Sequence, residues 1–308
     1  MKNLPKVVVV MSTYNGEKFL KTQIDSILAQ KDVEVILHIF DDVSKDKTVE
    51  IAREYESKHK NVFVHINERN KNYTYNFLDG VFMFKDNQEY DYYAFADQDD
   101  FWVEDKLITA VNKLKEMGEC SLYSSNLTIV DGDLKETGKT NIDMAYSHKK
   151  YDQLFFDSVT GCTAVFDKEF KNLVTKHYPE DLLYHDYWVA LIACFCKDAK
   201  YYLDMNPSHI LYRQHGSNAS GGFHKKQKFY RLRRLFGGIE VNFKILSQLL
   251  QYFKDEVDET DKVIIEKFIN YKKLKNKFYL LKHLDCTGRN RFKIKLLLNR
   301  YKNKFGGK

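Results

Sequence analysis

Residues 90–100 read YDYYAFADQDD, an apolar, aromatic-rich run that ends in three carboxylates, Asp97, Asp99 and Asp100. This pattern predicts a buried strand that stops at an acidic turn. Clustered carboxylates repel one another and burial penalises each of them, so the turn is costly unless a cation or a hydrogen-bond donor offsets the charge. Hard oxygen ligands suit Mg²⁺ or Mn²⁺. The alternative is a solvated loop whose acids cap a helix.

Upstream of this run, strand and helix patterns alternate. Residues 6–11, 33–40 and 62–66 are predicted strands, while residues 19–30 and 47–57 show the apolar spacing of helices. A β-α-β-α-β order predicts a parallel sheet. Polar residues follow each strand, and ligands of open α/β sheets bind beyond the carboxyl ends of the strands. The sequence therefore predicts one crevice built from segments far apart in the chain.

Composition indicates a compact globular protein. The 308 residues include 21 Tyr and 22 Phe but only 3 Pro and 14 Gly, which argues against disorder. This length suits one large α/β domain with an appendage, or two domains. No run approaches the roughly 20 apolar residues of a spanning helix, and the 5 Cys form an odd, unpatterned set. We therefore expect a cytoplasmic protein, soluble or peripheral to the membrane.

Basic residues are concentrated near the end of the chain. Residues 271–308 contain thirteen Lys or Arg and one acid, Asp285, and residues 223–236 contain six Lys or Arg and no acid. In residues 292–305 apolar and basic side chains interleave, so a helix there could lie on an anionic membrane surface. The alternatives are a helical appendage packed on the rest of the protein and, less favoured, binding to nucleic acid.

Three motifs carry a resemblance to a known family. They are VVVVMSTYNGEKFLKTQIDSILAQ at residues 7–30, IFDDVSKDKT at 39–48 and FADQDDFWVEDKL at 95–107. In this order they resemble the amino-terminal half of family 2 glycosyltransferases. Three later segments, TGCT at 160–163, YHDYW at 184–188 and YRQHGSN at 212–218, resemble the rhamnosyltransferase-like branch. The resemblance covers residues 5 to about 220.

The resemblance implies a fold and a domain division. The fold is α/β of the GT-A type, a Rossmann-like, mostly parallel sheet flanked by helices, with a basic α-helical appendage at the C-terminus. Residues 1–220 would form the catalytic domain, with a nucleotide-binding half at about 1–105 and an acceptor half at about 106–220. Residues 221–308 would form the basic helical region.

The resemblance also assigns donor-binding roles. Six positions match nucleotide contacts: Ser12, Tyr14, Asp42, Lys71, Asn76 and Asp97. Asp99 matches the direct metal ligand, Asp97 a ribose or supporting partner, and His215 a further candidate ligand for Mn²⁺ or Mg²⁺. Arg213 and His215 could counter diphosphate charge in a closing loop, with Gly216, Gly221 and Gly222 permitting a mobile lid. Val43 and Asn72 stand where the family commonly has glycine, so the local turns are expected to differ.

Catalytic roles follow from the later motifs. Asp186 matches the base that removes the acceptor proton, and His185 could orient Asp186, pair with it or touch the acceptor. Gly161, Cys162 and Trp188 are candidates for the sugar or acceptor pocket, although Cys162 and Trp188 could equally pack in the core. Asp100 and Asp105 are interpreted as a helix-start acid and a surface residue.

The resulting hypothesis is an inverting, metal-dependent, non-processive glycosyltransferase of bacterial surface polysaccharide synthesis. The first-choice donor is dTDP-L-rhamnose, and the alternative is a UDP-hexose transferase for galactose, glucose or N-acetylhexosamine. A sugar-1-phosphate nucleotidyltransferase is disfavoured because no glycine- and arginine-rich loop follows the first strand. A binding-only protein would not need Asp186 opposite a metal. The expected acceptor is a glycan, presented as a lipid-diphosphate-linked oligosaccharide at the inner face of the cell membrane, which the basic C-terminal region would contact.

Overall fold

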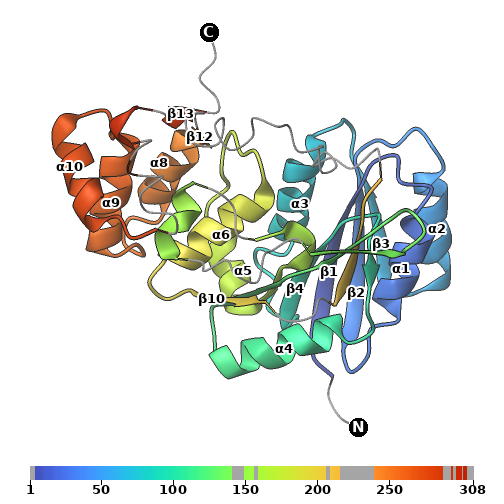
Figure 1. Ribbon diagram of the computed structural model, residues 1–308. Helices are drawn as coiled ribbons and strands as arrows, with labels where there is room; N and C mark the ends of the chain where they lie inside the picture. Colours follow the sequence, from blue (N-terminus) through green and yellow to red (C-terminus); the bar gives the residue numbers. More distant parts are fainter. Residues whose placement is uncertain are drawn as a thin grey trace.

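The computed structural model describes residues 4–140, 149–155, 159–205, 209–215, 239–286, 293, 296–299 and 301–303. Figure 1 shows a central sheet with helices on both faces and a helical group at one side. The elements before the acidic turn are β1 (Lys6–Thr13), α1 (Leu20–Leu28), β2 (Glu34–Asp41), α2 (Thr48–Lys58), β3 (Val62–Ile66), α3 (Asn72–Phe82) and β4 (Tyr92–Ala96). All five predicted strands and helices upstream of α3 are therefore present, within about two residues of the expected ends.

The acceptor half contains shorter elements. They are β5 (Phe101–Trp102), α4 (Lys106–Met117), β6 (Ser121–Ser125), β7 (Thr128–Val130), β8 (Glu136–Thr140), η1 (Lys150–Leu154), η2 (Gly161–Thr163), β9 (Val165–Asp167), α5 (Lys168–Val174), α6 (His185–Phe195), β10 (Lys200–Asp204) and β11 (Ile210–Arg213). The C-terminal region contains β12 (Ile239–Val241), α8 (Phe243–Tyr252), α9 (Glu259–Ile269), α10 (Leu274–His283) and β13 (Tyr301–Asn303).

The seven-stranded central sheet has the order β10-β6-β9-β4-β1-β2-β3. Every pairing among β1, β2, β3 and β4 is parallel, and only β9 runs antiparallel to its neighbours β4 and β6. The predicted, mostly parallel α/β sheet is confirmed. Because β1, β2 and β4 are parallel, the polar residues that follow each of them lie at one edge of the sheet.

Side chains alternate between the two faces of β1. Val7 and Val9 belong to an apolar cluster that includes residues of α1, α2 and α4, whereas Val8 and Val10 belong to a second cluster that includes residues of α3 and α6. All four valines are buried. Strands covered on both faces read as continuous apolar runs, which explains the VVVV sequence. Apolar packing on both faces of the sheet therefore holds in place the edge at which the polar residues after β1, β2 and β4 lie.

The C-terminal helices share the core of the catalytic body. Ile245, Leu249 and Phe253 in and after α8 are fully buried in the same apolar cluster as Trp188 of α6. The helical region predicted from the sequence is present, although residues 216–238 and most of 287–308 lie outside the described residues. Among the described helices, none combines the length and hydropathy that crossing a bilayer requires.

Candidate active site

A cavity of about 620 Å³ opens at the carboxyl edge of the sheet. Its lining brings together residues in or next to β1, β2, β4, α3, η2, α6 and β11: Ser12, Tyr14, Asp42, Asn70, Asn72, Tyr73, Phe77, Asp97, Gln98, Asp99, Val159, Thr160, Gly161, Tyr184, His185, Asp186 and Tyr212. Eight of these were predicted as site residues from the sequence. The cavity is therefore the predicted crevice, and it extends from the end of β2 to the start of α6.

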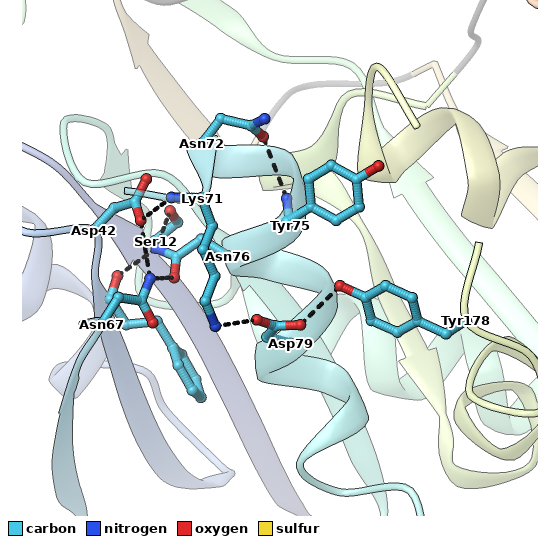
Figure 2. Close-up of polar contacts among 10 residues, drawn as sticks. Ser12, Asp42, Asn67, Lys71, Asn72, Tyr75, Asn76, Asp79 and Tyr178 are labelled. Atoms are coloured by element: carbon cyan, nitrogen blue, oxygen red, sulfur yellow. Dashed lines mark hydrogen bonds and ion pairs between the residues drawn. The ribbon is translucent and has the colours of Figure 1, made fainter. Parts of the chain in front are cut away.

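Asp42 is a buried carboxylate held at one end of this cavity. Its Oδ1 accepts hydrogen bonds from Asn67 Nδ2 at 2.9 Å and from the backbone N–H of Lys71 at 2.8 Å. Its carbonyl oxygen accepts a bond from Asn70 Nδ2 at 3.1 Å. Figure 2 shows how the contacts of Asp42 with Asn67 and Lys71 join the end of β2 to the start of α3. The adjacent Asp41 instead faces inward, where it accepts bonds from Ser44.

Asn76 supports the same end of the site from behind. Its side-chain amide donates to Ser12 Oγ at 2.8 Å and to the Phe40 carbonyl at 2.6 Å, and its oxygen accepts from Asn67 at 2.8 Å. Asn76 is fully buried and does not line the cavity. It therefore positions Ser12 and Asn67 and is not placed for direct contact with a ligand.

Lys71 is also placed differently from the sequence expectation of a nucleotide contact. Its ammonium group pairs with Asp79 at 2.6 Å, and Asp79 in turn accepts a bond from Tyr178 (Figure 2). The side chain is absent from the cavity lining, so only the backbone N–H of Lys71 acts on the site, through Asp42.

The two residues that replace family glycines both have glycine-like backbones. Val43 has a φ of 67° and Asn72 a φ of 65°. Asn tolerates this left-handed region better than most residues, whereas a β-branched side chain is strained there. The turn after Asp42 therefore keeps a left-handed shape although Gly is absent.

Replacing Val43 with Gly is expected to stabilise the fold by up to about 1 kcal/mol, because relief of the strain exceeds the added entropy of the unfolded chain. Chemical denaturation at fixed pH measures this change. Asn72→Gly is the matched control, and we expect no stabilisation from it because Asn72 Oδ1 also accepts a bond from the N–H of Thr74 at 2.9 Å. A loss of stability in Val43→Gly would contradict the strain argument.

The acidic turn after β4 is more buried than the sequence suggested. Burial, together with the charges of Asp99 and Asp186, raises the pKa of Asp97 to about 7. Burial also raises the pKa of Asp99, although its hydrogen bond from His215 opposes the shift. Carboxylates driven toward protonation in this way gain most from a nearby cation.

Asp100 corrects the sequence interpretation. It is fully buried and is not a helix-start acid, since α4 begins at Lys106 with the exposed Asp105 as its N-cap. Its Oδ1 accepts the backbone N–H of Arg213 at 3.2 Å, and no donor nitrogen or oxygen among the described residues bonds its buried Oδ2. One oxygen of Asp97, one of Asp100 and the sulfur of Cys162 lie within 4.8 Å of one another. Asp100 therefore belongs to the acidic cluster.

His215 and Arg213 approach the cluster from β11 and the residues just after it. His215 Nε2 lies 2.8 Å from Asp99 Oδ2, and Arg213 Nε donates to the Asp99 carbonyl at 2.8 Å. Both side chains pack against the ring of Phe19. Arg213 is buried and does not line the cavity, so its positive charge acts on the acidic cluster from within the protein and not from the cavity. The predicted glycine lid, which begins at Gly216, lies outside the described residues.

The donor set fits a hard divalent cation. One oxygen each of Asp97 and Asp100 and the sulfur of Cys162 lie within 4.8 Å of one another, and in the same turn Asp99 Oδ2 lies 2.8 Å from the imidazole nitrogen Nε2 of His215. Oxygen with one imidazole is chemistry that Mn²⁺ accepts readily and Mg²⁺ accepts through its oxygens. The cluster is therefore suited to the predicted ion.

Asp186 lies in the first turn of α6, across the cavity from the acidic cluster. Its Oδ2 accepts the backbone N–H of Gly161 at 3.1 Å, and its Oδ1 accepts the N–H of Tyr187 at 2.9 Å. The carboxylate is therefore oriented by backbone donors and lines the cavity. Among the three roles considered for His185, orienting or pairing with Asp186 is not what the structure shows.

His185 is instead held between aromatic rings. It stacks on Phe77 with ring centroids 4.1 Å apart and meets the edge of Phe95 at 4.9 Å. Burial lowers the pKa of His185 to about 4, so the ring is neutral near pH 7. Neither ring nitrogen has a hydrogen-bond partner within the described residues, although the ring lines the cavity. A Cβ at Gly161 would lie 2.6 Å from His185 Nε2, which explains the glycine.

Two predicted pocket residues lie in the core, which was the alternative that the sequence left open. Trp188 is fully buried and packs against Phe253 at 5.8 Å, so its ring offers no face to a sugar. Cys162 is fully buried behind Asp97 and Asp100, and burial raises the pKa of its thiol far above its usual value. Of these three candidates, only Gly161 lines the cavity.

Sequence reasoning missed several cavity residues. Gln98, between the paired acids, binds both backbone groups of Tyr14, at 2.9 Å through its oxygen and at 3.0 Å through its amide. A Cβ at Gly16 would lie 2.2 Å from the Gln98 oxygen, so the glycine leaves room for this contact. Tyr73 and Phe77 enter from α3. The position of Gln98 within the acidic motif was a usable signal, whereas the aromatic residues carried none.

Comparisons with known proteins show which sequence family and which folds this chain is similar to. Residues 8–172 match the sequence model of the family described as glycosyl transferase family 2. The chain is 34% identical over 236 residues to the dTDP-rhamnosyl transferase RfbG of Shigella flexneri, covering 72% of this chain and 78% of that protein. It is also 29% identical over 204 residues to the uncharacterized glycosyltransferase MJ1057 of Methanocaldococcus jannaschii, covering 61% and 65%.

Two solved structures are similar in fold. S. aureus TarS 1–349 in complex with UDP-GlcNAc superposes with a TM-score of 0.60 at 16% identity, covering 96% of this chain and 80% of that one. The mannosyltransferase PcManGT from Pyrobaculum calidifontis, in complex with GDP-Man and Mn²⁺, gives a TM-score of 0.51 at 15% identity, covering 91% and 73%. At these identities the likeness concerns the fold alone.

Proposed function

Since the chain belongs to glycosyl transferase family 2 and has the GT-A fold of a glycosyltransferase, we propose that it transfers one sugar from a nucleotide diphosphate donor with inversion. The first-choice donor is dTDP-L-rhamnose. The single observation that carries this proposal is the cavity that has Asp42 at one end, Asp97 and Asp99 beside it and Asp186 across from them. A nucleotide-diphosphate sugar would place its base at Asp42, its diphosphate at Asp97 and Asp99, and its sugar next to Asp186.

At the nucleotide end, Asp42 is proposed to read the base. Its Oδ1 is occupied by Asn67 and Lys71, which fixes the carboxylate and leaves Oδ2 to accept a ring N–H of thymine or uracil. Ser12 and Tyr14 border the nucleoside, and Asp97 lies where it could contact the ribose. The name of the Shigella flexneri relative supports thymidine diphosphate over uridine diphosphate, without excluding UDP-hexoses.

At the diphosphate, Asp99, Asp97 and His215 are proposed to hold Mn²⁺ or Mg²⁺, and Asp100, which has an oxygen within 4.8 Å of one of Asp97, is proposed as a further ligand. When bound, the ion neutralises charge that builds on the departing diphosphate. His215 and Asp99 lie 2.8 Å apart, which is compatible with ligands that share one ion. Arg213 donates a hydrogen bond to the backbone carbonyl of Asp99 and brings a positive charge next to the acidic cluster.

At the sugar, Asp186 is proposed to take the proton of the acceptor hydroxyl while the oxygen of that hydroxyl bonds to the anomeric carbon. The bond between that carbon and the diphosphate oxygen breaks on the opposite side, which gives inversion. The neutral, unpaired nitrogens of His185 are proposed to meet a hydroxyl of the sugar or acceptor. Phe77 and Val159 supply apolar wall beside it, which suits the methyl group of a 6-deoxy sugar.

The acceptor is proposed to be a glycan linked to a lipid diphosphate, used in bacterial surface polysaccharide synthesis. A protein working at the cytoplasmic face of the membrane would meet such an acceptor. The absence of the Q-x-x-R-W signature favours addition of a single sugar.

A donor panel tests the proposal. Release of nucleoside diphosphate is measured with dTDP-rhamnose, UDP-galactose, UDP-glucose and UDP-N-acetylglucosamine, with Mn²⁺, Mg²⁺ or a chelator. We expect dTDP-rhamnose to react fastest, and chelation to abolish the reaction. Asp42→Asn is the internal control, because it should weaken binding of free dTDP and free UDP as well as of the nucleotide sugars, whichever sugar these carry. Failure of all four donors to bind or react would overturn the proposal, and preference for a UDP-hexose would replace the donor.

A further inference from the structure

Helix α10 presents an apolar ridge to solvent. Leu274 is 68% exposed and Phe278 is 63% exposed, more than any other exposed large apolar side chain of the described residues. They are four residues apart, so they lie on one face of the helix. Leu281, one turn further, is only partly buried. Figure 1 places α10 at the outer edge of the helical group, far from β1, β2 and β3.

The ridge is separate from the face that packs on the protein. Asn276, Lys277 and Leu280 carry the buried side of α10. With about 100° between successive residues, Leu274 and Phe278 lie beside that buried side, and Lys275 lies beyond them on the exposed side. The helix thus shows a buried face, an apolar exposed stripe and a cationic stripe in that order.

The charge around the ridge is strongly positive. Lys272, Lys273 and Lys275 are exposed, and none of them pairs with a carboxylate within the described residues. The one acid of residues 271–308, Asp285, is paired with Lys149 at 2.7 Å. The apolar stripe is therefore bordered by cations whose charge is not cancelled nearby.

A second exposed apolar segment lies next to the helix. Lys277 Nζ donates to the carbonyl oxygen of Leu297 at 3.4 Å, which holds the turn at residues 296–299 against α10. Leu297 is 55% exposed and Leu298 is 48% exposed. Two further exposed leucines thus belong to a segment that contacts α10 through Lys277.

We propose that Leu274, Phe278, Leu297 and Leu298 form a lipid-binding ridge that enters the surface of an anionic bilayer, with Lys272, Lys273 and Lys275 on its headgroups. Apolar side chains that enter the acyl boundary beside cations that remain at the headgroups are the requirement for peripheral binding. The sequence placed this contact in a helix at residues 292–305, and that expectation is wrong for Tyr301–Asn303, which form the strand β13, while residues 292, 294, 295, 300, 304 and 305 lie outside the described residues. The proposed ridge instead combines two residues of α10, Leu274 and Phe278, with Leu297 and Leu298 of that segment.

Charge distinguishes this partner from the alternatives. A second copy of the chain docked on the same ridge would bring Lys against Lys, since a two-fold interface pairs identical surfaces. Nucleic acid would use the lysines but would gain little from four exposed apolar side chains, because phosphate contacts dominate its binding. An anionic bilayer uses both. The proposal rests on the proposed function only in that a lipid-linked acceptor would make such docking useful.

The test is sedimentation of the full chain with phosphatidylglycerol-containing vesicles and with pure phosphatidylcholine vesicles. We expect binding to the anionic vesicles that weakens as salt is added. Leu274→Ser/Phe278→Ser should weaken it at least about tenfold, since two apolar side chains are lost from the bilayer. Lys272→Gln/Lys273→Gln/Lys275→Gln should weaken it by about fivefold for each charge near the surface. Leu4→Ser/Met83→Ser, two exposed apolar residues on the nucleotide-binding half, is the matched control and should bind as the parent does.

Equal binding by the parent and Leu274→Ser/Phe278→Ser would overturn the proposal. So would a parent dimer that this variant converts to monomer, or a parent that binds single-stranded DNA and not vesicles. Donor hydrolysis without vesicles keeps the two proposals apart, because the ridge variants should retain it. Vesicle binding without any donor reaction would overturn the proposed function alone, and the reverse result would overturn the ridge alone.

Discussion

Asp186→Asn is expected to lower turnover by about 10²- to 10⁴-fold while donor binding stays nearly unchanged, because loss of a general base removes a contribution of that size. Asn keeps the size of the side chain and an oxygen for one of the two backbone donors, Gly161 and Tyr187. It cannot take the acceptor proton. Initial rates over a range of donor concentrations separate the effect on kcat from that on KM, and titration with the nucleoside diphosphate reports binding.

Asp181→Asn is the matched control for this variant. Asp181 lies five residues upstream, is exposed and pairs with Lys244 outside the cavity. The same chemical change there should leave kcat within about twofold of the parent, as expected for a surface ion pair. If Asp186→Asn retained full turnover, another group would have to act as the base, and the proposed role of Asp186 would be wrong.

Asp99→Asn is expected to lower turnover by at least about 10²- to 10³-fold and to raise the Mn²⁺ concentration needed for half-maximal activity. The reason is that a bound cation contributes several kcal/mol to stabilising the leaving diphosphate, and Asp99 is the proposed direct ligand. Activity at a fixed donor concentration, measured across a series of Mn²⁺ concentrations, gives both numbers. Binding of Mn²⁺ to the protein without donor is a second readout that does not depend on turnover.

Asp105→Asn provides the comparison for Asp99→Asn. Asp105 lies six residues downstream, is largely exposed and contacts His209 instead of the cavity. Its variant should respond to Mn²⁺ as the parent does. An Asp99→Asn protein with an unchanged Mn²⁺ response would show that Asp99 is not a ligand, and Asp97 with Asp100 would then be the remaining carboxylates of the cluster.

The parallel sheet and the place of the crevice were predictable because both follow from local patterns. The apolar run at Val7–Val10 and the acids after β4 each carry their own signal, and the family motifs fix their order. The burial of Asp100 could not be read in this way. It depends on β11, more than 100 residues away, whose Arg213 backbone N–H covers the carboxylate.

The side-chain assignments in α6 show the same limit. His185, Asp186 and Trp188 are neighbours in the sequence, yet two line the cavity and one faces the core. Helical rotation places Trp188 toward α8, and the position of α8 is set by contacts that no local pattern reveals. The membrane-binding prediction changed for a related reason, since burial of Leu280 and exposure of Phe278 are decided by packing on the catalytic body.

The short 3₁₀ helix η2 connects the proposed base, Asp186, with the acidic cluster of Asp97 and Asp100. Its first residue, Gly161, holds Asp186 through a backbone N–H, and its second, Cys162, lies against Asp97 and Asp100. The carbonyl of Ala164 then accepts a bond from Phe95 of β4 at 3.3 Å. Inserting or deleting one residue here would move the base relative to the leaving group. Natural relatives with the same chemistry should therefore differ in length elsewhere in the chain, while this turn keeps its residue count.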